Sequence, residues 1–347
     1  MAFNYSMYNY VDLVPAFSEV VQRNRLLQTL GIFKKVPSDH VKIAVDRLIE
    51  DTRSLINAPT SRYGSDYNTT ARGSYSSYLI ELPSFSRVDS ISAQDFQAGI
   101  RKFGTDSEET YTSLLADTIQ KHADAHAATV EQYYSAALFK GTLNTPYTQD
   151  KLIDYNDSFD RDFLTGTIDL TDQSLDVLES INGFVDQINA AAGGLFSKIN
   201  RIVVFCGAQA YNKLRFSPSM KSYFQYVSPL DSGNVVVQRR EILGNVSTFS
   251  APGMSVDFVK CEDVELTDNI AANEMVFVPL FDQSVGAYQH IYGPSSRNTY
   301  LARDAGPAEV FNYTTESDLG EMTIHFESSL LPVVHATGCI MKVTVTV

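Results

Sequence analysis

The longest amphipathic pattern in the chain lies at residues 105–141. This stretch contains no proline and no internal glycine, and it is rich in Ala, Leu, Glu and Gln, which favour helix. At 100° per residue, one side of the predicted helix collects Tyr111, Leu115, Ile119, His122, His126, Val130, Tyr133 and Ala137. The opposite side collects Asp117, Lys121, Asp124, Glu131 and Ser135. The pattern therefore predicts one amphipathic helix, about 50 Å long at 1.5 Å per residue.

Both ends of this predicted helix carry the residues that usually start and stop a helix. Thr105 and Glu108 form a capping box at the beginning, and Gly141 is a typical stop. Leu138 and Phe139 in the last turn lie off the apolar side, so we expect that end to be buried on several sides. A helix of such length lies across a protein as a strut rather than inside a small core.

Two alternating segments ahead of the helix predict a pair of strands joined by a long polar loop. Apolar and polar residues alternate at residues 41–45 and again at residues 78–82. Residues 57–77 between them are rich in Gly, Ser, Thr, Asn and Tyr, so they form no core of their own. We interpret them as a projecting hairpin that acts by contact, because tyrosine supplies amphipathic area to interfaces. Disorder is the alternative.

The first 40 residues predict an arm rather than a domain. They combine a tyrosine-rich tip with one short amphipathic segment that ends at Gly31. Composition selects the following candidate subunit-interface residues from the arm and the hairpin: Tyr8, Tyr10, Arg62, Tyr63, Tyr67, Arg72, Tyr75 and Tyr78.

Beyond the long helix, helix and strand alternate before the chain becomes mainly strand. A second helix, capped by Thr171, is expected to run to Gly193. A buried strand at residues 199–205 leads into a helix at residues 208–216. From Val235 onward the segments VVVQ, DFVK, MVFVPLF, EMTIHFES and MKVTVTV predict strands. This order predicts an α+β fold without repeating βαβ units.

The charge balance of the chain is acidic. The 347 residues carry 27 Lys and Arg against 41 Asp and Glu, a formal net charge of −14. Affinity for nucleic-acid phosphate comes from Lys and Arg, so this balance argues against a nucleic-acid binder but not against a wall that encloses nucleic acid. Three widely spaced cysteines form neither a disulfide framework nor a zinc pattern and fit a reducing cytoplasm. We expect neither a secretory signal nor a membrane-spanning segment.

Two places in the sequence carry weak patterns of ligand-binding sites. The turn at Cys206 and Gly207 has a single glycine and lacks the Lys-Ser/Thr of a phosphate loop, so an ordinary tight turn is expected. His122 and His126 could hold a metal from one helix face. The glutamate of the H-E-x-x-H motif and a third ligand are missing, so a packing role is expected instead.

Two further constellations also fall short of a site. Asp154 begins a segment similar to a calcium loop, but Phe159 stands where the sharp turn requires glycine. A catalytic triad could be assembled on paper from His290, His325 and His335, but the sequence supplies no geometry for it. We expect no catalytic residue, cofactor or metal.

Four segments, in this order, carry a resemblance to a known family. They are ATVEQYYSAALFKGTL, INRIVVFCGAQAYNKLRFSPSMKSYF, NEMVFVPLFDQSVGAYQHIYGPSSRNT and EMTIHFESSLLPVVHATGCIMKVTV. Each is an apolar strand or helix with a distinctive turn, and together with the order of elements they span nearly the whole chain. They resemble the major capsid protein of lambda-type tailed bacteriophages, the phage major capsid protein E family, which has the Hong Kong 97-type capsid fold.

The resemblance implies a domain organisation. The helix at about 105–141 would be the spine helix of the peripheral domain. The implied division is residues 1–45 as N-terminal arm, 46–95 as extended loop, 96–165 with 311–347 as peripheral domain, and 166–310 as axial domain.

The resemblance also implies a function without enzyme chemistry. Such a protein is the major capsid (head) protein, self-assembling into hexamers and pentamers of an icosahedral shell around the double-stranded DNA genome. The implied partners are further copies of the chain, a portal protein, separate scaffolding and decoration proteins, and DNA enclosed without sequence-specific binding. The implied location is the virion capsid, after assembly in the cytoplasm of the host bacterium.

One branch of this fold forms an isopeptide crosslink through a lysine in the extended loop. Here no lysine occurs between Lys42 and Lys102, so a shell without that crosslink is expected. Two alternatives stay open: an encapsulin-like protein compartment, and a soluble α+β nucleotide-binding enzyme that uses the turn at Cys206.

Overall fold

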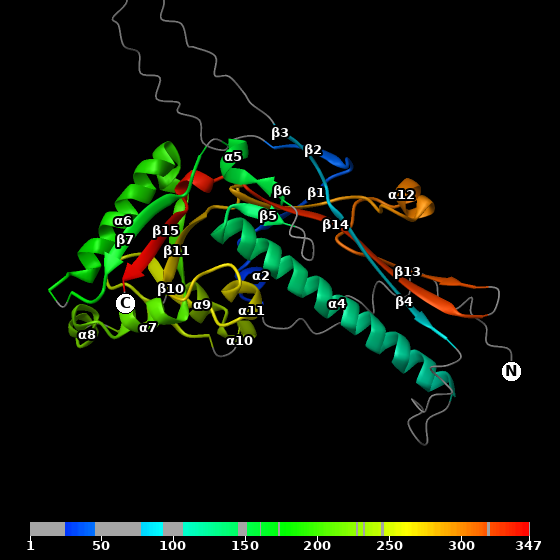
Figure 1. The fold of residues 1–347 in the computed structure, drawn as a ribbon, viewed down its shortest axis with the longest axis horizontal. Coiled ribbons are helices and arrows are strands. Elements are labelled where there is room, and N and C mark those ends of the chain that lie inside the picture. The colour runs from blue at the N-terminus through cyan, green and yellow to red at the C-terminus, as the bar shows by residue number, and fades with distance from the viewer. Residues whose placement is uncertain are drawn as a thin grey trace, which may run out of the picture.

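The long helix predicted from the sequence is α4, Ser107–Phe139 (Figure 1). The computed structural model describes residues 25–45, 78–92, 107–144 and 151–346, apart from residues 160, 173, 227, 232, 244–245 and 318–319. The expected cap, Thr105, lies outside the described residues. At the other end Gly141 has a φ of 70°, which glycine adopts most easily, and its N–H donates to the Ala136 carbonyl (3.1 Å). The helix therefore ends where the sequence places its stop.

The C-terminal end of α4 packs against a sheet with strand order β7-β15-β11-β8-β10-β9 in the described chain. Its strands are β7 (Leu164–Asp169), β8 (Ile199–Cys206), β9 (Thr248–Ser250), β10 (Val256–Lys260), β11 (Glu274–Phe281) and β15 (Met341–Thr346). β7 pairs with β15, and β8 with β10, in parallel, and the other neighbours are antiparallel. The central strands β8 and β11 are buried along most of their length because helices cover both faces.

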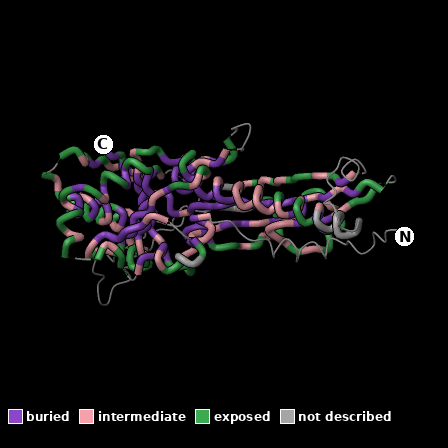
Figure 2. The backbone as a smooth tube through the Cα atoms, turned by 90° about the horizontal axis from the view of Figure 1, so that it is seen from below, coloured by how far each residue is buried: buried purple, intermediate pink, exposed green. Residues whose placement is uncertain are grey.

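Each face of this six-stranded sheet has its own set of helices. One face carries α6 (Val177–Ala192), α7 (Ala208–Arg215) and α8 (Pro218–Phe224), whose apolar residues share a cluster with the sheet. The other face carries the end of α4 together with α2 (Leu26–Leu30), α9 (Val235–Gln238), α10 (Arg240–Leu243) and α11 (Val264–Thr267). The result is a thick block in which buried residues are concentrated (Figure 2).

The N-terminal half of α4 lies along a second sheet. In the described chain it holds β1 (Lys34–Pro37), β4 (Ser84–Ile91), β12 (Tyr288–Tyr292), β13 (Phe311–Glu316) and β14 (Met322–Val334). The long strand β14 pairs with β12 through its second half, and with β13 and β4 through its first half. A small cluster joins helix and sheet there: Ile91, Leu115, Ile119, Met322 and Ile324. The molecule narrows to a slender part at this end (Figure 2), and α12 (Thr299–Asp304) lies beside β13 and β14 (Figure 1).

Two short sheets complete the described chain. β2 (Lys42–Val45) pairs in antiparallel fashion with β3 (Tyr78–Glu81), which confirms the strand pairing predicted on either side of the polar loop. β5 (Thr142–Asn144) pairs with β6 (Lys151–Asp154), and α5 (Tyr155–Phe159) follows directly. None of the helices in the described ranges combines the length and the apolar character that a membrane crossing needs.

Two local predictions are wrong. The VVVQ segment forms α9 rather than a strand, because the Asn234 side chain accepts the N–H groups of Val236 and Val237 and so caps a helix. The second long helix is capped by Asp176 rather than Thr171, since the Asp176 carboxylate accepts from Leu178 and Glu179. In both cases the side chain of an Asn or Asp residue accepts the first N–H groups and determines where the helix begins.

Candidate functional site

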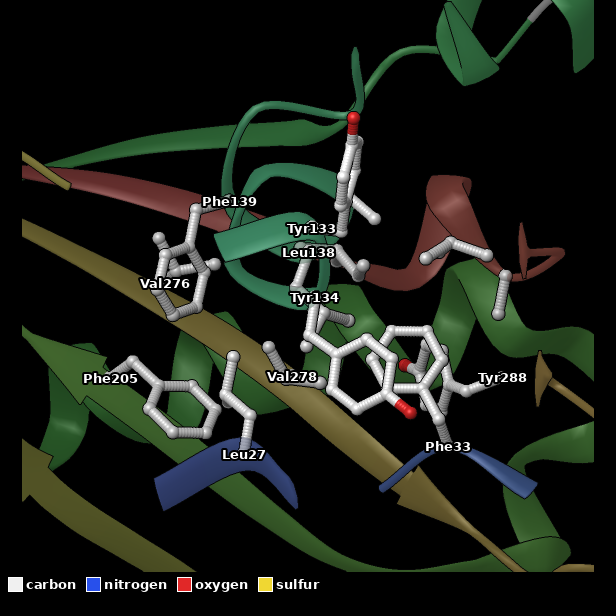
Figure 3. Close-up of a cluster of buried hydrophobic side chains, with 14 of the residues drawn as sticks. Leu27, Phe33, Tyr133, Tyr134, Leu138, Phe139, Phe205, Val276, Val278 and Tyr288 are labelled. Carbon is white, nitrogen blue, oxygen red and sulfur yellow. The ribbon is translucent and has the colours of Figure 1, made fainter. Parts of the chain in front are cut away.

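The end of α4 is held in a buried apolar joint to which several distant parts of the chain contribute (Figure 3). Tyr134 of α4 stacks on Phe33, with ring centroids 4.1 Å apart, and Phe139 lies 5.3 Å from Phe205 of β8. The other labelled side chains in Figure 3 include Leu27 of α2, Val276 and Val278 of β11, and Tyr288 of β12. This apolar joint therefore connects the N-terminal segment, the long helix and both sheets.

A buried carboxylate, Glu131 of α4, fastens α2 to the apolar joint. Its oxygens accept the backbone N–H groups of Leu27 at 2.7 Å and Gln28 at 3.2 Å, and the Gln28 side-chain amide donates at 3.1 Å. Glu131 is 0% exposed, and burial raises its pKa to about 7 although these hydrogen bonds act in the opposite direction. Nearby, Arg25 pairs with Glu265 at 2.7 Å, which ties the same segment to α11.

Glu131 and Ser135 were predicted on the exposed side of the helix, and this prediction is wrong. Ser135 donates to the Glu265 carbonyl at 2.7 Å and accepts from the Asn269 side chain at 2.6 Å. These partners, like Leu27, lie more than 100 residues away along the chain. The one local indication is that Leu138 and Phe139 lie off the apolar side in the last turn, which predicted burial of that end on several sides; both residues are 0% exposed.

The two histidines of α4 connect the helix to the second sheet. The buried His122 hydrogen-bonds to Asp89 of β4, and this bond lowers the pKa of Asp89 below its usual value. His126 Nε2 lies 3.2 Å from Ser328 Oγ of β14, and both histidine rings contact Phe326. The packing role expected for both residues is therefore observed. In the described ranges, no group of three or more His, Cys, Asp or Glu is arranged to hold a metal ion.

A second buried histidine, His290 of β12, lies close to His126. Its ring contacts Tyr134 edge-on, with centroids 5.6 Å apart. Burial, together with a smaller effect of the neighbouring His290, lowers the pKa of His126 to about 4. Burial likewise lowers the pKa of His290 to about 4. Both rings are therefore neutral at pH 7, which suits their enclosed position.

The turn at Gly207 is closed to a phosphate group. The N–H groups of Gln209 and Ala210 at the start of α7 both donate to the Ala272 carbonyl at 3.0 Å. A Cβ on Gly207 would lie 2.1 Å from the Ala271 carbonyl oxygen, so the 271–272 backbone occupies the place that a ligand would need. The tight-turn interpretation is supported, and the geometry gives the nucleotide-binding alternative no cradle.

The remaining candidate constellations serve local structure. The Asp154 carboxylate accepts the N–H groups of Asn156 and Asp157 and pairs with Lys151 at 2.6 Å, so it caps α5. The three triad histidines lie in separate environments: His290 against Tyr134, His325 stacked on Tyr313, and His335 near Phe159.

Most of the interface residues selected by composition lie outside the described part of the chain. These are Tyr8, Tyr10, Arg62, Tyr63, Tyr67, Arg72 and Tyr75. Tyr78 begins β3, opposite Val45 of β2. The structure adds exposed aromatic residues that the sequence pattern did not indicate: Phe216, Tyr226 and Tyr300, which are 59%, 87% and 73% exposed. They stand at helix ends and in loops, where no periodicity distinguishes them.

A long helix crosses from a thick block to a slender sheet, and a solved structure shares this fold. The chain is similar to the putative capsid protein of a prophage of E. coli CFT073, with a TM-score of 0.63 and 13% identity over 97% of this chain and 99% of that one. It also matches the mature capsid of bacteriophage PhiM1 (TM-score 0.48, 12% identity, 94% and 88% coverage). The capsid of an empty GTA particle gives a TM-score of 0.48 and 13% identity, with 94% and 92% coverage. The first match carries the assignment, and the fold is the Hong Kong 97-type capsid fold.

The family profile described as phage major capsid protein E matches residues 9–345, nearly the whole chain. The chain belongs to this family and is a phage major capsid protein, a structural component of the virion capsid that assembles with copies of itself. A comparison with curated proteins gives no match.

Proposed function

We propose that copies of this chain form the hexamers and pentamers of an icosahedral shell that encloses a double-stranded DNA genome. The observation that carries the proposal is α4, which connects a two-sided block to a slender sheet and so sets the span of one subunit in a wall. Closing such a shell needs complementary surfaces and no chemistry, which agrees with the closed turn at Gly207.

The proposed division of labour follows the fold. Residues 1–45 would be the arm that ties subunits together, and residues 46–95 the extended loop that reaches over a neighbour. α4 would be the spine of the peripheral domain, residues 96–165 with 311–347, and residues 166–310 the axial domain. The strand pairing adds two adjustments. β15 lies in the six-stranded sheet between β7 and β11, so we assign it to the axial block. β12 lies in the second sheet between β1 and β14, so we assign it to the peripheral domain.

The proposed partners beyond the shell itself are a portal protein and separate scaffolding and decoration proteins. The DNA would be enclosed without sequence-specific binding. The net charge of −14 supports this, because an acidic wall repels the polymer rather than binding it. Assembly would take place in the cytoplasm of the host bacterium, before the genome is packaged.

Electron microscopy of the purified protein tests the proposal. Closed shells or rings of five and six subunits are expected, whereas uniform small particles at all concentrations would contradict it. Shells that hold a cargo enzyme instead of DNA would indicate an encapsulin-like compartment. Deleting residues 57–77 should abolish assembly; unchanged assembly would show that the segment is not an interface.

Denaturing electrophoresis of mature particles tests the expected absence of a covalent crosslink. A single band at the mass of one chain, 38.5 kDa, is expected because no lysine lies between Lys42 and Lys102. A ladder of covalent oligomers would contradict this expectation.

A further inference from the structure

Charge is distributed very unevenly along the part of the chain that builds the six-stranded sheet. Residues 187–230 contain no Asp or Glu, and their cations are Lys198, Arg201, Lys213, Arg215 and Lys221. The preceding residues 150–186 have two cations, Lys151 and Arg161, and are otherwise strongly acidic: Asp150, Asp154, Asp157, Asp160, Asp162, Asp169, Asp172, Asp176, Glu179 and Asp186. In a chain with a net charge of −14, a basic stretch of this length stands out against its surroundings.

The fold places both stretches on one face of the sheet, where they meet at the contact between α6 and α8. The acidic stretch contains β7, an edge strand, and α6, which packs beside β7. The basic stretch contains α7, which packs on β10 next to the opposite edge strand, β9, and leads into α8. α6, α7 and α8 all lie on the same face of the sheet (Figure 1).

A basic corner is formed where α7 meets α8, and we define it as Lys213, Arg215, Phe216 and Lys221. Phe216 is 59% exposed, and the Arg215 guanidinium and the Lys221 ammonium lie 5.9 and 6.0 Å from its ring centroid. The cation–π contacts hold both charges around an exposed ring. No salt bridge to any of these three cations is found within the described residues. Aromatic residues with Arg are the side chains that dominate the binding energy of protein interfaces.

An acidic face is presented by α6 and the turn before it, and we define it as Asp172, Glu179 and Asp186. Glu179 and Asp186 are seven residues apart, so they lie on the same side of α6, and both are exposed. Neither forms a salt bridge with a described cation. Asp176 is excluded from this face because it caps α6 and accepts from the Tyr223 hydroxyl of α8 at 3.2 Å within the same chain.

We propose that the basic corner of one copy docks on the acidic face of the next copy, and that this contact closes the rings of the shell. The inference rests on the proposed function and deepens it, since the occupant of each surface is a second copy of the chain. Two different surfaces that complement each other make a head-to-tail contact between copies, and such a contact generates a ring when the rotation closes. The opposite charges select the partner surface, and Phe216 supplies the apolar anchor between them.

Two double variants test the contact. Lys213→Glu with Lys221→Glu reverses the basic corner, and Glu179→Lys with Asp186→Lys reverses the acidic face. Assembly is followed by light scattering after size exclusion and by electron microscopy, and circular dichroism with thermal melting verifies that each variant is folded. Each double variant should need at least about tenfold more protein to form rings, because like charges then face each other. The variant with all four substitutions has the net charge of the wild type, and it should assemble again.

Mixing the two double variants gives a sharper readout. The reversed corner of one variant then meets the reversed face of the other, and the two unchanged surfaces also meet. Rings in which the two variants alternate can therefore form. Alternation closes a ring of six but not a ring of five, and the mixture should therefore give hexamers without pentamers. Unimpaired assembly of either double variant, or failure of the fourfold variant to recover, overturns the proposed contact while the wild type still assembles. A wild type that forms no rings overturns the proposed function itself, and with it this inference.

Discussion

The two halves of α4 belong to the same helix but have different surroundings. In the N-terminal half, buried Leu115, Ile119 and His122 alternate with exposed Asp117 and Lys121, and the helix rests on one sheet. In the C-terminal half, the residues from Val130 to Phe139 are buried on nearly every side. A single amphipathic pattern therefore describes the helix correctly where it lies on a surface and fails where the same helix enters a core.

Truncating one apolar side chain in each half should show the largest effect. Phe139→Ala should lower the free energy of unfolding by about 3–5 kcal/mol, because it opens a cavity beside Phe205 in the apolar joint. Ile119→Ala, in the small cluster between helix and second sheet, should cost about 2–3 kcal/mol. Urea denaturation of unassembled subunits measures both. Equal losses would show that the two halves of α4 contribute alike to stability.

The buried carboxylate of the C-terminal half should make the subunit more stable in mild acid. The folded-state pKa of Glu131 is about 7, against an ordinary value of 4.5. The folded chain therefore holds a proton that the unfolded chain loses between these values, so this stabilising contribution is complete below pH 4.5 and is lost as the pH rises through 7. Acidification from pH 8 to pH 5 should raise the free energy of unfolding by about 2 kcal/mol through the protonation of Glu131.

Glu131→Gln is the matched variant for that measurement. It removes the titration while keeping the size of the side chain and one oxygen for the Leu27 and Gln28 amides. Urea denaturation of wild type and variant at pH 8 and pH 5 measures the effect. The increase in the free energy of unfolding that Glu131 gives the wild type should be absent in the variant. A variant with the same pH profile as the wild type would show that Glu131 is already ionised at pH 5.

The histidines at the second sheet should act in the opposite direction. The pKa values of His126 and His290 fall from 6.5 to about 4 on folding. Their contribution to stability is therefore complete above pH 6.5 and is lost as the pH falls toward 4, because the unfolded chain takes up protons first. Lowering the pH from 7 to 5 should reduce the free energy of unfolding by about 1–2 kcal/mol for each histidine.

Replacing His126 by Gln should flatten this loss, and NMR titration of the ring protons measures the pKa directly. Lowered pKa values for both His126 and His290 would show that the contact between α4 and the second sheet is sensitive to acid. A pKa near 6.5 for His126 would mean that water reaches the ring, which would weaken the contrast between the two attachments.

The smallest effect is expected on the exposed side of the N-terminal half. Lys121→Ala should change the free energy of unfolding by less than about 0.5 kcal/mol, since the side chain is exposed and alanine favours helix. A loss above about 1 kcal/mol in unassembled subunits would show that this side of the strut is covered within the chain.

How much the sequence can reveal differs between these regions for a physical reason. The stop at Gly141 and the buried positions Leu115, Ile119 and Val130 follow from local periodicity and backbone preference. The burial of Glu131 depends on α2, a segment about 100 residues away, and no local pattern reports such a partner. The exposed Phe216 is likewise invisible to periodicity, because its importance comes from the cations that the turn between α7 and α8 brings over its ring.

Competition between strand preference and helix capping explains why the VVVQ segment was predicted as a strand but forms a helix. The apolar VVVQ segment fits a strand by side-chain preference, but the amide of Asn234 captures the first N–H groups and starts a helix. The same residue donates to Thr248 and Ser250 of β9, so its position is determined by a strand that follows it in the chain.

The pairing of β4 with β14 has a mechanical consequence. Eight register pairs join the two strands, from Ser84 with Ser329 to Ile91 with Met322, and β4 follows residues 46–77 by way of β3. A pull directed along the axis of β4 would load this ladder in shear, so its hydrogen bonds would share the force instead of opening one at a time. When internal pressure strains the wall, the pairing of β4 with β14 can resist through the number of paired residues rather than the strength of any single hydrogen bond.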